Sequence, residues 1–270
     1  DVTFTDAVGG STAMGNITIT TGALSAAAMK VQGTIDITNT DTSSITGIIS
    51  DGASSAIVTK AGSATLTLSG NNTYTGQTNI NAGIISITHN NALGSADGAT
   101  IVADGASLSI SNDITSAENI TISGTGISSN GAIRNTADDN TLTGLITLAA
   151  NSEIQIDTGS SLTLNPTTGN AVTGTYNLTI ESVGTSSIND PIATSTGNIT
   201  KTGAGTLTLS GTNTYSGDTT ISAGTIKLTG AVNTATDLVI ESGATLDLQA
   251  TQTFATLDLD GTISNSAGSS

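Results

Sequence analysis

The sequence predicts an all-β protein in which residues 1–270 form a single domain, a three-sided parallel β-helix (β-solenoid). Three observations select this fold. One 28-residue block occurs twice, the residues expected to face inward are uniformly Ile, Leu, Val and Ala, and aromatic residues make up only 2% of the chain, with two prolines. A broad globular core draws much of its buried area from aromatic side chains, whereas the coils of a solenoid bury aliphatic columns against their neighbours alone.

The repeat block lies at residues 60–87 and 201–228, where 17 of 28 aligned positions are identical. The two copies start 141 residues apart (201 − 60 = 141). Internal repetition at a fixed spacing is typical of solenoids. We expect about 12 coils, stacked at about 4.8 Å, so the spacing spans several coils and the block marks a longer unit.

Short strands are predicted throughout, because two aliphatic residues repeatedly flank one polar residue. This alternation occurs at 17–19, 35–37, 66–68, 108–110, 120–122, 154–156, 162–164, 178–180, 207–209, 226–228, 246–248 and 257–259. Only residues 21–30 have local helical character, and they lack a sustained apolar stripe.

The turns are predicted from Gly and Asn. Glycine supplies the positive φ that sharp corners need, and Asn71, Asn72 and Asn213 are candidates for the same conformation or for ladders between coils. Pro166 and Pro191 flank a less regular stretch, 165–198, and the tail at 265–270 is expected to be frayed.

The charge balance excludes some partners. Only five residues are basic against 21 acidic ones, a net charge of −16. Nucleic-acid binding requires Lys and Arg to neutralise phosphates, so we expect no nucleic-acid partner, and docking on anionic membranes is disfavoured too. No apolar run approaches the roughly 18 residues of a membrane span, so no membrane insertion is expected. The absence of Cys excludes disulfides and thiolate chemistry.

The repeat block resembles the autotransporter-associated β-strand repeat of bacterial passenger domains. The pattern K-x-G-x-G-T-L-T-L-S-G-x-N-T-Y-x-G-x-T-x-I-x-A-G is met in full at 201–224, and the first copy departs from it at Ala64. Residues 131–135, 142–148 and 151–164 look like the stretch between such repeats, and 242–248 like its usual exit strand.

The resemblance implies a right-handed parallel β-helix that is exported and displayed outside a bacterial cell, as a stalk or adhesive element. The family has no shared catalytic residues to carry over. A complete autotransporter also has a C-terminal membrane barrel. We therefore expect this chain, which begins at Asp1 without a signal peptide, to be a passenger fragment or a mature member delivered another way.

Two places in the sequence are candidates for catalysis. The single histidine, His89, is expected to be solvated in a turn, because no nucleophile motif accompanies it. Arg134 near Asp138 and Asp139 is the best candidate for a polysaccharide-active β-helix enzyme that uses calcium, and a local ion pair is the simpler interpretation. Glu153 and Asp157 are expected about 13 Å apart on one strand face, too far for a glycosidase pair.

The remaining candidates concern binding. Asp258 and Asp260 share a strand face, and with Asp247 they leave weak Ca²⁺ binding open, although solvated acids are the simpler interpretation. Tyr74 and Tyr215 occupy the same slot of the block and are expected to pack at a corner. Four pairs of threonines two residues apart could form a flat ice-binding array: Thr3 and Thr5, Thr18 and Thr20, Thr65 and Thr67, and Thr206 and Thr208. The simpler interpretation is that Thr suits an exposed strand face.

The leading hypothesis is therefore a non-enzymatic extracellular β-helix on a bacterial surface, an adhesin stalk or passenger scaffold. It has no catalytic, cofactor-binding or metal-binding residues and no cofactor. Its expected partners are a host or neighbouring cell surface, a glycan, or a second copy through self-association of the β-helix ends. A filament built by end-to-end stacking and a polysaccharide-active enzyme are the alternatives.

Overall fold

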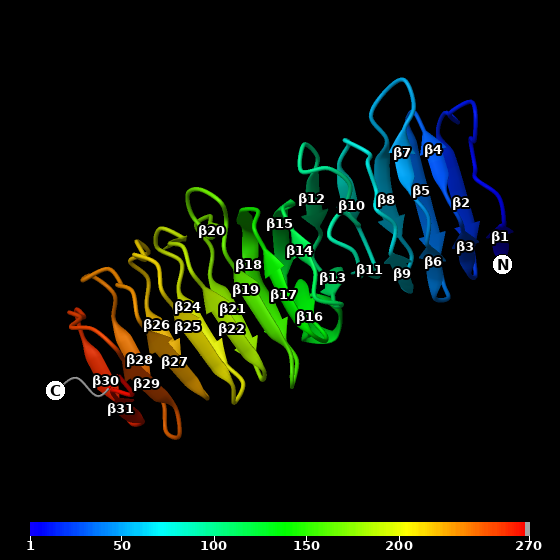
Figure 1. Ribbon diagram of the computed structural model, residues 1–270. Helices are drawn as coiled ribbons and strands as arrows, with labels where there is room; N and C mark the ends of the chain where they lie inside the picture. Colours follow the sequence, from blue (N-terminus) through cyan, green and yellow to red (C-terminus); the bar gives the residue numbers. More distant parts are fainter. Residues whose placement is uncertain (268–270) are drawn as a thin grey trace.

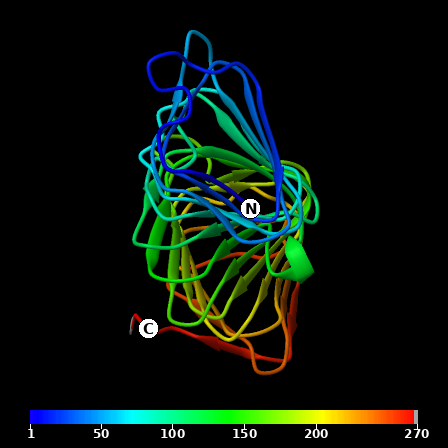
Figure 2. The same ribbon diagram turned by 90° about the vertical axis from the view of Figure 1, so that its right-hand side faces the viewer.

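The computed structural model describes residues 1–267 and is an all-β parallel solenoid of about 13 turns. The chain winds into an elongated rod with its termini at opposite ends (Figure 1), and the view in Figure 2 looks along the stacked coils. Every strand pairing among the described residues is parallel, and no α-helix occurs there. The one helical element is the 3₁₀ turn η1 (Ile127–Ser129). The β-solenoid predicted from the sequence is confirmed.

The coils form three sides of the rod, although some coils have strands on only two of them. Side 1 contains β2 (Ile17–Thr21), β5 (Thr34–Asn39), β8 (Ile57–Ala61), β10 (Thr78–Ile80), β12 (Ala99–Val102), β15 (Asn119–Gly124), the start of β18 (Ile146–Ile156), β20 (Val172–Thr173) and β23 (Ile192–Ala193).

Side 2 runs through all the coils. It contains β1 (Val2–Phe4), β3 (Leu24–Ala26), β6 (Ser43–Ile45), β9 (Thr65–Leu68), β11 (Ile84–Ile87), β13 (Ser107–Ile110), β16 (Ile133–Asn135), the end of β18, β21 (Leu178–Ser182), β24 (Ile199–Thr202), β26 (Thr219–Ile221), β28 (Leu238–Ile240) and β30 (Leu257–Leu259).

Side 3 begins as β4 (Met29–Val31) and β7 (Ile49–Asp51) and continues through irregular segments. From the middle of the chain it is an eight-stranded sheet. This sheet contains β14 (Thr115–Ser116), β17 (Asp139–Leu142), β19 (Ser161–Leu164), β22 (Thr185–Ile188), β25 (Thr206–Leu209), β27 (Thr225–Leu228), β29 (Thr245–Leu248) and β31 (Thr262–Ser264).

All twelve alternating tripeptides lie within these strands. Residues 21–30, which have local helical character in the sequence, contain the end of β2, β3 and most of β4. The less regular stretch at 165–198 still contributes β20, β21 and β22, with β23 near its end. Its irregularity is confined to the connections between these short strands.

The core is one continuous cluster of aliphatic side chains stacked in columns. On side 2, for example, Leu66, Ile85, Leu108 and Ile133 occupy the same register position in four successive coils, and all four are fully buried. Burial of apolar surface in each column stabilises the fold by about 25 cal/mol for each Å² removed from water. Because the coils repeat the same contacts, Ile, Leu, Val and Ala suffice to fill the interior.

The two copies of the repeat block lie on different sides of the rod. The first copy places its opening strands on sides 1 and 2 (β8 and β9), whereas the second places them on sides 2 and 3 (β24 and β25). Six pairings lead along side 1 from β8 through β10, β12, β15, β18 and β20 to β23, and β24 is the next strand. The two blocks are therefore separated by six complete turns and one additional side. The irregular connection that follows the second strand of each block accordingly lies on side 3 in the first copy and on side 1 in the second.

The asparagines predicted at the corners do not adopt the positive φ that was one of the two roles expected for them. Asn71, Asn72 and Asn213 do not have positive φ. Within residues 1–267, the non-glycine residues that do are Asn112, Asp113, Ser128, Ser129, Asp138 and Ser195. Instead, Asn72 and Asn213 are buried, and their side-chain oxygens accept the backbone N–H groups of Ile49 and Ile192 in the preceding coil at 2.7 and 2.9 Å. They satisfy backbone groups where the strand ladder is interrupted.

Ladders between coils do form. Asn91 donates its side-chain amide to Asn71 at 2.8 Å, and the Asn151 and Asn177 oxygens each accept a backbone N–H from the following coil at 3.0 and 2.9 Å.

Two glycines, Gly62 of the first block and Gly105 outside both blocks, show how sensitive different corners are to substitution. Gly62 has φ +80°, and an added Cβ would lie 2.3 Å from the carbonyl oxygen of Asn39, whereas Gly105 has φ +76° with open space around it. We expect Gly105→Ala to lower the free energy of unfolding by about 1 kcal/mol, the cost of a left-handed residue. Gly62→Ala adds a backbone clash and is expected to cost about 2 kcal/mol more. Equal midpoints of urea unfolding for the two variants would contradict the expectation.

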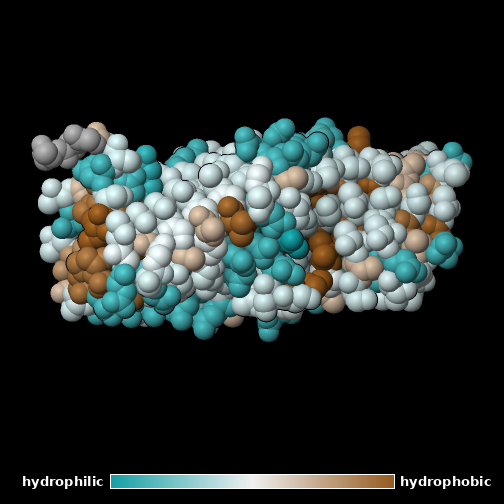
Figure 3. Space-filling model, turned by 90° about the horizontal axis from the view of Figure 1, so that it is seen from below, coloured by the Kyte–Doolittle hydropathy of each residue, from teal (hydrophilic) through white to brown (hydrophobic). Residues whose placement is uncertain are grey.

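The last described coil exposes apolar side chains that continue the core columns. Leu257 and Leu259 pair with buried Leu238 and Ile240, and Ile263 pairs with buried Leu246, yet the three are 48%, 46% and 41% exposed. Figure 3 shows apolar surface at this end of the molecule. The tail expected at 265–270 lies outside the described residues from 268 onward.

Candidate functional site

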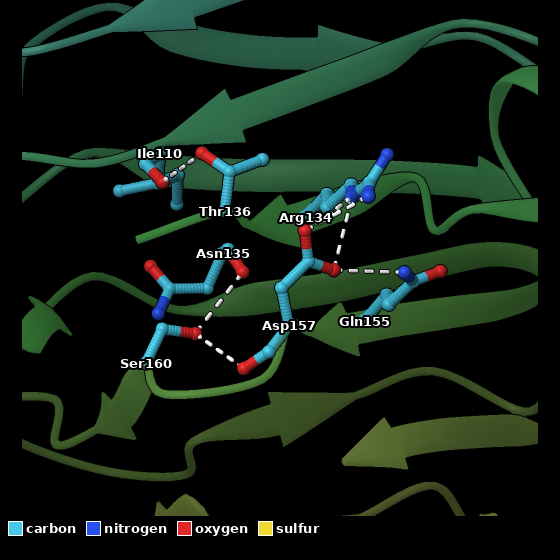
Figure 4. A network of polar contacts seen from close by, with 7 residues as sticks. All are labelled: Ile110, Arg134, Asn135, Thr136, Gln155, Asp157 and Ser160. Carbon is cyan, nitrogen blue, oxygen red and sulfur yellow. Dashed lines mark hydrogen bonds and ion pairs between the residues drawn. The ribbon is translucent and has the colours of Figure 1, made fainter. Parts of the chain in front are cut away.

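Arg134 is the centre of a polar network on the outer surface of side 2. It points outward from β16, between β13 and the end of β18. Its Nε donates to both carboxylate oxygens of Asp157 at 3.1 and 3.0 Å, and its Nη2 donates to Oδ2 at 2.8 Å. Gln155 Nε2 donates to the same carboxylate at 2.9 Å (Figure 4). The network joins two consecutive coils.

The ion pair predicted for Arg134 exists, but its partner is Asp157 rather than Asp138 or Asp139. Asp138 lies in the turn after β16 and accepts the backbone N–H of Asn112 at 2.9 Å. The backbone N–H of Asp139 donates to Asp113 at 3.0 Å. Asp138 and Asp139 lie away from Arg134 because β16 ends at Asn135 and the chain then turns onto side 3. The carboxylate that reaches Arg134 therefore comes from Asp157 in the next coil.

A hollow of about 120 Å³ lies on the other flank of Arg134. Its floor is the outer surface of β11, β13 and β16, and its overhang is the connection that contains η1. The connection is fixed by Ser107, whose hydroxyl donates to the carbonyl of Gly131 at 2.8 Å and accepts the N–H of Ile127 at 3.0 Å. The lining residues are Ile84, Ser107, Ser109, Ile127, Asn130, Arg134 and Thr136.

Two glutamates are buried without full hydrogen bonding. Glu118 is 3% exposed; its Oε1 accepts the Thr100 hydroxyl at 3.0 Å, and its Oε2 has no partner among the described residues. Glu153, outward on β18, is 9% exposed, and its Oε1 is likewise unpartnered. Burial raises the pKa of Glu118 to about 7 against a weaker opposite effect of Thr100, and burial together with the Glu181 charge raises the pKa of Glu153 to about 7.

Lys60 and Lys201 are fully buried at equivalent positions of the two repeat blocks. The Lys60 ammonium donates to the carbonyl oxygens of Ala61, Gly62 and Ala82 at 2.7, 2.8 and 3.2 Å. Lys201 donates to the carbonyls of Ser182, Thr202, Gly203 and Ala223, at 2.6 to 3.3 Å. Burial lowers the pKa of each lysine to about 8, so both remain charged at pH 7.

Tyr74 and Tyr215 are packed corner residues, as predicted. Both are fully buried, and their hydroxyls form hydrogen bonds with Thr78 and Thr219 at 2.6 and 2.8 Å. They belong to the core and are not available as surface binding residues.

The other candidates do not assemble into a site. His89 lies at a turn, where its Nδ1 accepts the N–H of Asn91 at 3.1 Å. Asp247 on side 3 is held by Ser266 and Gln249, whose hydrogen bonds outweigh the opposing effect of burial and lower its pKa. Asp258 lies on side 2, away from Asp247. Among the described residues no three His, Cys, Asp or Glu side chains are grouped to hold a metal ion.

The threonine pairs do not form one array. Thr18 and Thr20 lie on side 1, Thr65 and Thr67 on side 2, and Thr206 and Thr208 on side 3. Thr3 shares side 2 with Thr67, but Ser25 and Ser44 stand between them in register. A flat ice-binding surface built from these four pairs is therefore wrong for this fold.

Comparison with known proteins adds a family match to this geometry. Residues 58–87 and 199–228 each match the model of the passenger-associated-transport-repeat. The matches begin at β8 and β24 and contain both buried lysines and both buried tyrosines. No curated protein and no solved structure matches the chain. Within the described residues there is no helix with the length and apolarity to cross a bilayer.

Proposed function

We propose that this chain, which carries two passenger-associated-transport-repeats on a β-solenoid, serves in an autotransporter passenger as a non-enzymatic adhesive stalk on the bacterial surface. The family of the repeats implies secretion to the cell surface or beyond it. The observation that carries the proposal is the placement of both repeats in one uninterrupted core, where the Lys, Asn, Tyr and aliphatic residues that both repeats share have structural tasks.

A rod of stacked coils suits a stalk because its length grows with each coil while its cross-section stays the same. At about 4.8 Å per coil, 13 turns extend about 60 Å. A stalk needs outward-facing surface that varies along the rod, and the irregular connections supply it. The net charge of −16 keeps such a rod soluble outside the cell.

The absence of a catalytic role is supported by the state of the residues that could act in one. The guanidinium of Arg134 forms an ion pair with Asp157. A guanidinium held in its charged form by a carboxylate is ill suited to act as a general base. Glu118 and Glu153 are buried where no substrate reaches them directly. The hollow beside Arg134 is lined by no second titratable side chain.

The proposal is tested by displaying the chain between a secretion signal and the membrane barrel of a known autotransporter. We expect the displayed chain to resist added protease and to increase the adhesion of the cells to host-cell layers, mucin or one another. The barrel alone and a Leu66→Asp variant, which places a charge in the core, serve as controls. Protease-resistant display without any gain in adhesion would overturn the adhesive role.

A further inference from the structure

The guanidinium of Arg134 uses only one of its edges for the ion pair. Arginine has five N–H donors in a planar fork, and Asp157 engages those of Nε and one of Nη2. Both N–H groups of Nη1 and the second of Nη2 have no partner among the described residues. Figure 4 shows a guanidinium nitrogen that points away from Asp157. This second edge has the geometry that accepts a planar carboxylate through two parallel hydrogen bonds.

The hollow places further unengaged polar groups next to that edge. The side-chain hydroxyl of Ser109 and the side-chain amide of Asn130 have no hydrogen-bond partner among the described residues, and both line the hollow with Arg134. Ser109 is in register with Arg134 on the adjacent coil, and Asn130 ends the overhanging connection. Two apolar side chains, Ile84 and Ile127, complete the walls.

The dimensions admit a small polar group rather than a macromolecular segment. A single bound water needs roughly 10–15 Å³ of such space, so about 120 Å³ holds several heavy atoms. The floor spans three coils, about 10 Å at the strand spacing. The hollow is open, so a chain attached to the bound group can leave along the outer surface of side 2.

We propose that this hollow binds the carboxylate-bearing sugar residue of an acidic glycan. The carboxylate is received by the free edge of Arg134, the ring hydroxyls by Ser109 and Asn130, and the apolar face of the ring by Ile127. A uronate matches this combination of one planar anion, several hydroxyls and an apolar ring face. The assignment deepens the proposed adhesive function and depends on it for its biological use, although the binding itself is measured on the isolated chain.

The net charge of −16 repels an anionic glycan at long range. Salt at about 0.15 M screens this repulsion beyond about 8 Å, whereas the contact with Arg134 is short and partly shielded. We therefore expect binding to persist at this salt concentration and to strengthen little when the salt is lowered.

The test is titration of the isolated chain with trigalacturonate, followed by calorimetry and by NMR of the backbone amides around residues 127–136. Maltotriose, a neutral sugar of the same length, tests whether the carboxylate is needed. Acetate tests whether a carboxylate without a sugar suffices, and a sulfated trisaccharide tests whether another anion on a sugar can replace the carboxylate. We expect trigalacturonate to bind at least tenfold more tightly than any of the three.

Variants locate the site. Arg134→Lys keeps a positive charge but loses the forked donor pattern, and it is expected to weaken binding about tenfold. The Ser109→Ala/Asn130→Ala variant leaves the Arg134–Asp157 pair intact and is expected to weaken binding several-fold. Ser86→Ala, at the same register position one coil earlier and outside the hollow, is the matched control and should leave binding unchanged.

Equal binding of maltotriose, acetate or the sulfated sugar would overturn the assignment, as would full binding by the Ser109→Ala/Asn130→Ala variant. The second variant decides the question even if Arg134→Lys disturbs folding. Adhesion of displaying cells without uronate binding would refute this site alone, and uronate binding without adhesion would refute the adhesive role alone.

Discussion

Replacement of Lys60 by methionine is expected to lower the free energy of unfolding by about 3 kcal/mol. The side chain is fully buried, and its ammonium fills the space between three carbonyl oxygens of two coils. Methionine has a similar volume and leaves those oxygens without this donor. An unsatisfied buried acceptor costs about 1–3 kcal/mol, so the loss of three contacts gives a large destabilisation.

The expected effect is smaller than the sum of three lost hydrogen bonds for a physical reason. Burial of the ammonium is itself unfavourable, as the lowered pKa of Lys60 shows, and methionine removes that cost as well. The carbonyl oxygens, however, are backbone groups at a corner and remain in place whatever side chain is present. The balance therefore stays destabilising.

Matched variants make the result interpretable. Lys30→Met, on the outward face of β4, is expected to change the free energy of unfolding by less than about 0.5 kcal/mol. Lys201→Met should reproduce the effect of Lys60→Met, and the double variant should be additive because six turns separate the sites. Urea unfolding at pH 7 measures all four. An unchanged midpoint for Lys60→Met would contradict a structural role for the ammonium.

Much of the fold was predictable because its rules are local. Alternation with a period of two marks many of the strands whose inward residues are both aliphatic, and all twelve segments identified from it are strands. The repeat block indicated a solenoid, and the scarcity of aromatic residues indicated its narrow core. What the alternation could not show is the side of the rod on which each strand lies, because that depends on the lengths of all the preceding connections.

The buried charges were missed although the sequence contains a signal for them. Val58 and Lys60 are two residues apart on one strand, as are Ile199 and Lys201, so the alternation that points the aliphatic residue inward points the lysine inward too. The general preference of lysine for the surface concealed this. The carbonyls that make the burial tolerable come from the two residues after each lysine and from neighbouring coils. That these groups converge on the ammonium is visible only in the structure.

The candidate site was predictable only in part. Arg134 was identified from its sequence, but Asp157, Ser109 and Asn130 reach it from a different coil, the neighbouring strand and an overhanging connection. No local pattern relates these positions. The burial of Glu153 was equally hidden, because Glu153 lies on the outward face of β18, where a strand pattern predicts exposure.

Stability is expected to fall as the pH rises from about 4.5 to 7, and Glu118 is expected to account for up to about 3 kcal/mol of that loss. Its pKa is raised to about 7 in the folded chain, from an ordinary value of 4.5. Between these values the folded state holds the proton and the unfolded state releases it. The stabilisation is therefore complete below about pH 4.5 and is lost as the pH rises through the folded pKa, at about 1.4 kcal/mol per unit of pKa difference.

Glu118→Gln tests this assignment because the amide keeps the acceptor for Thr100 and cannot ionise. The variant should match the wild type at pH 4 and exceed its free energy of unfolding by about 2–3 kcal/mol at pH 8. Glu153, whose pKa is raised likewise, leaves part of the slope, so the double Gln variant should be nearly flat. Glu241→Gln, at an exposed carboxyl, is the control. If Glu118→Gln kept the full wild-type slope between pH 4 and 8, the carboxyl of Glu118 would have to be ionised in the folded core, and the unpartnered Oε2 would then need a donor or a cation from outside the described contacts.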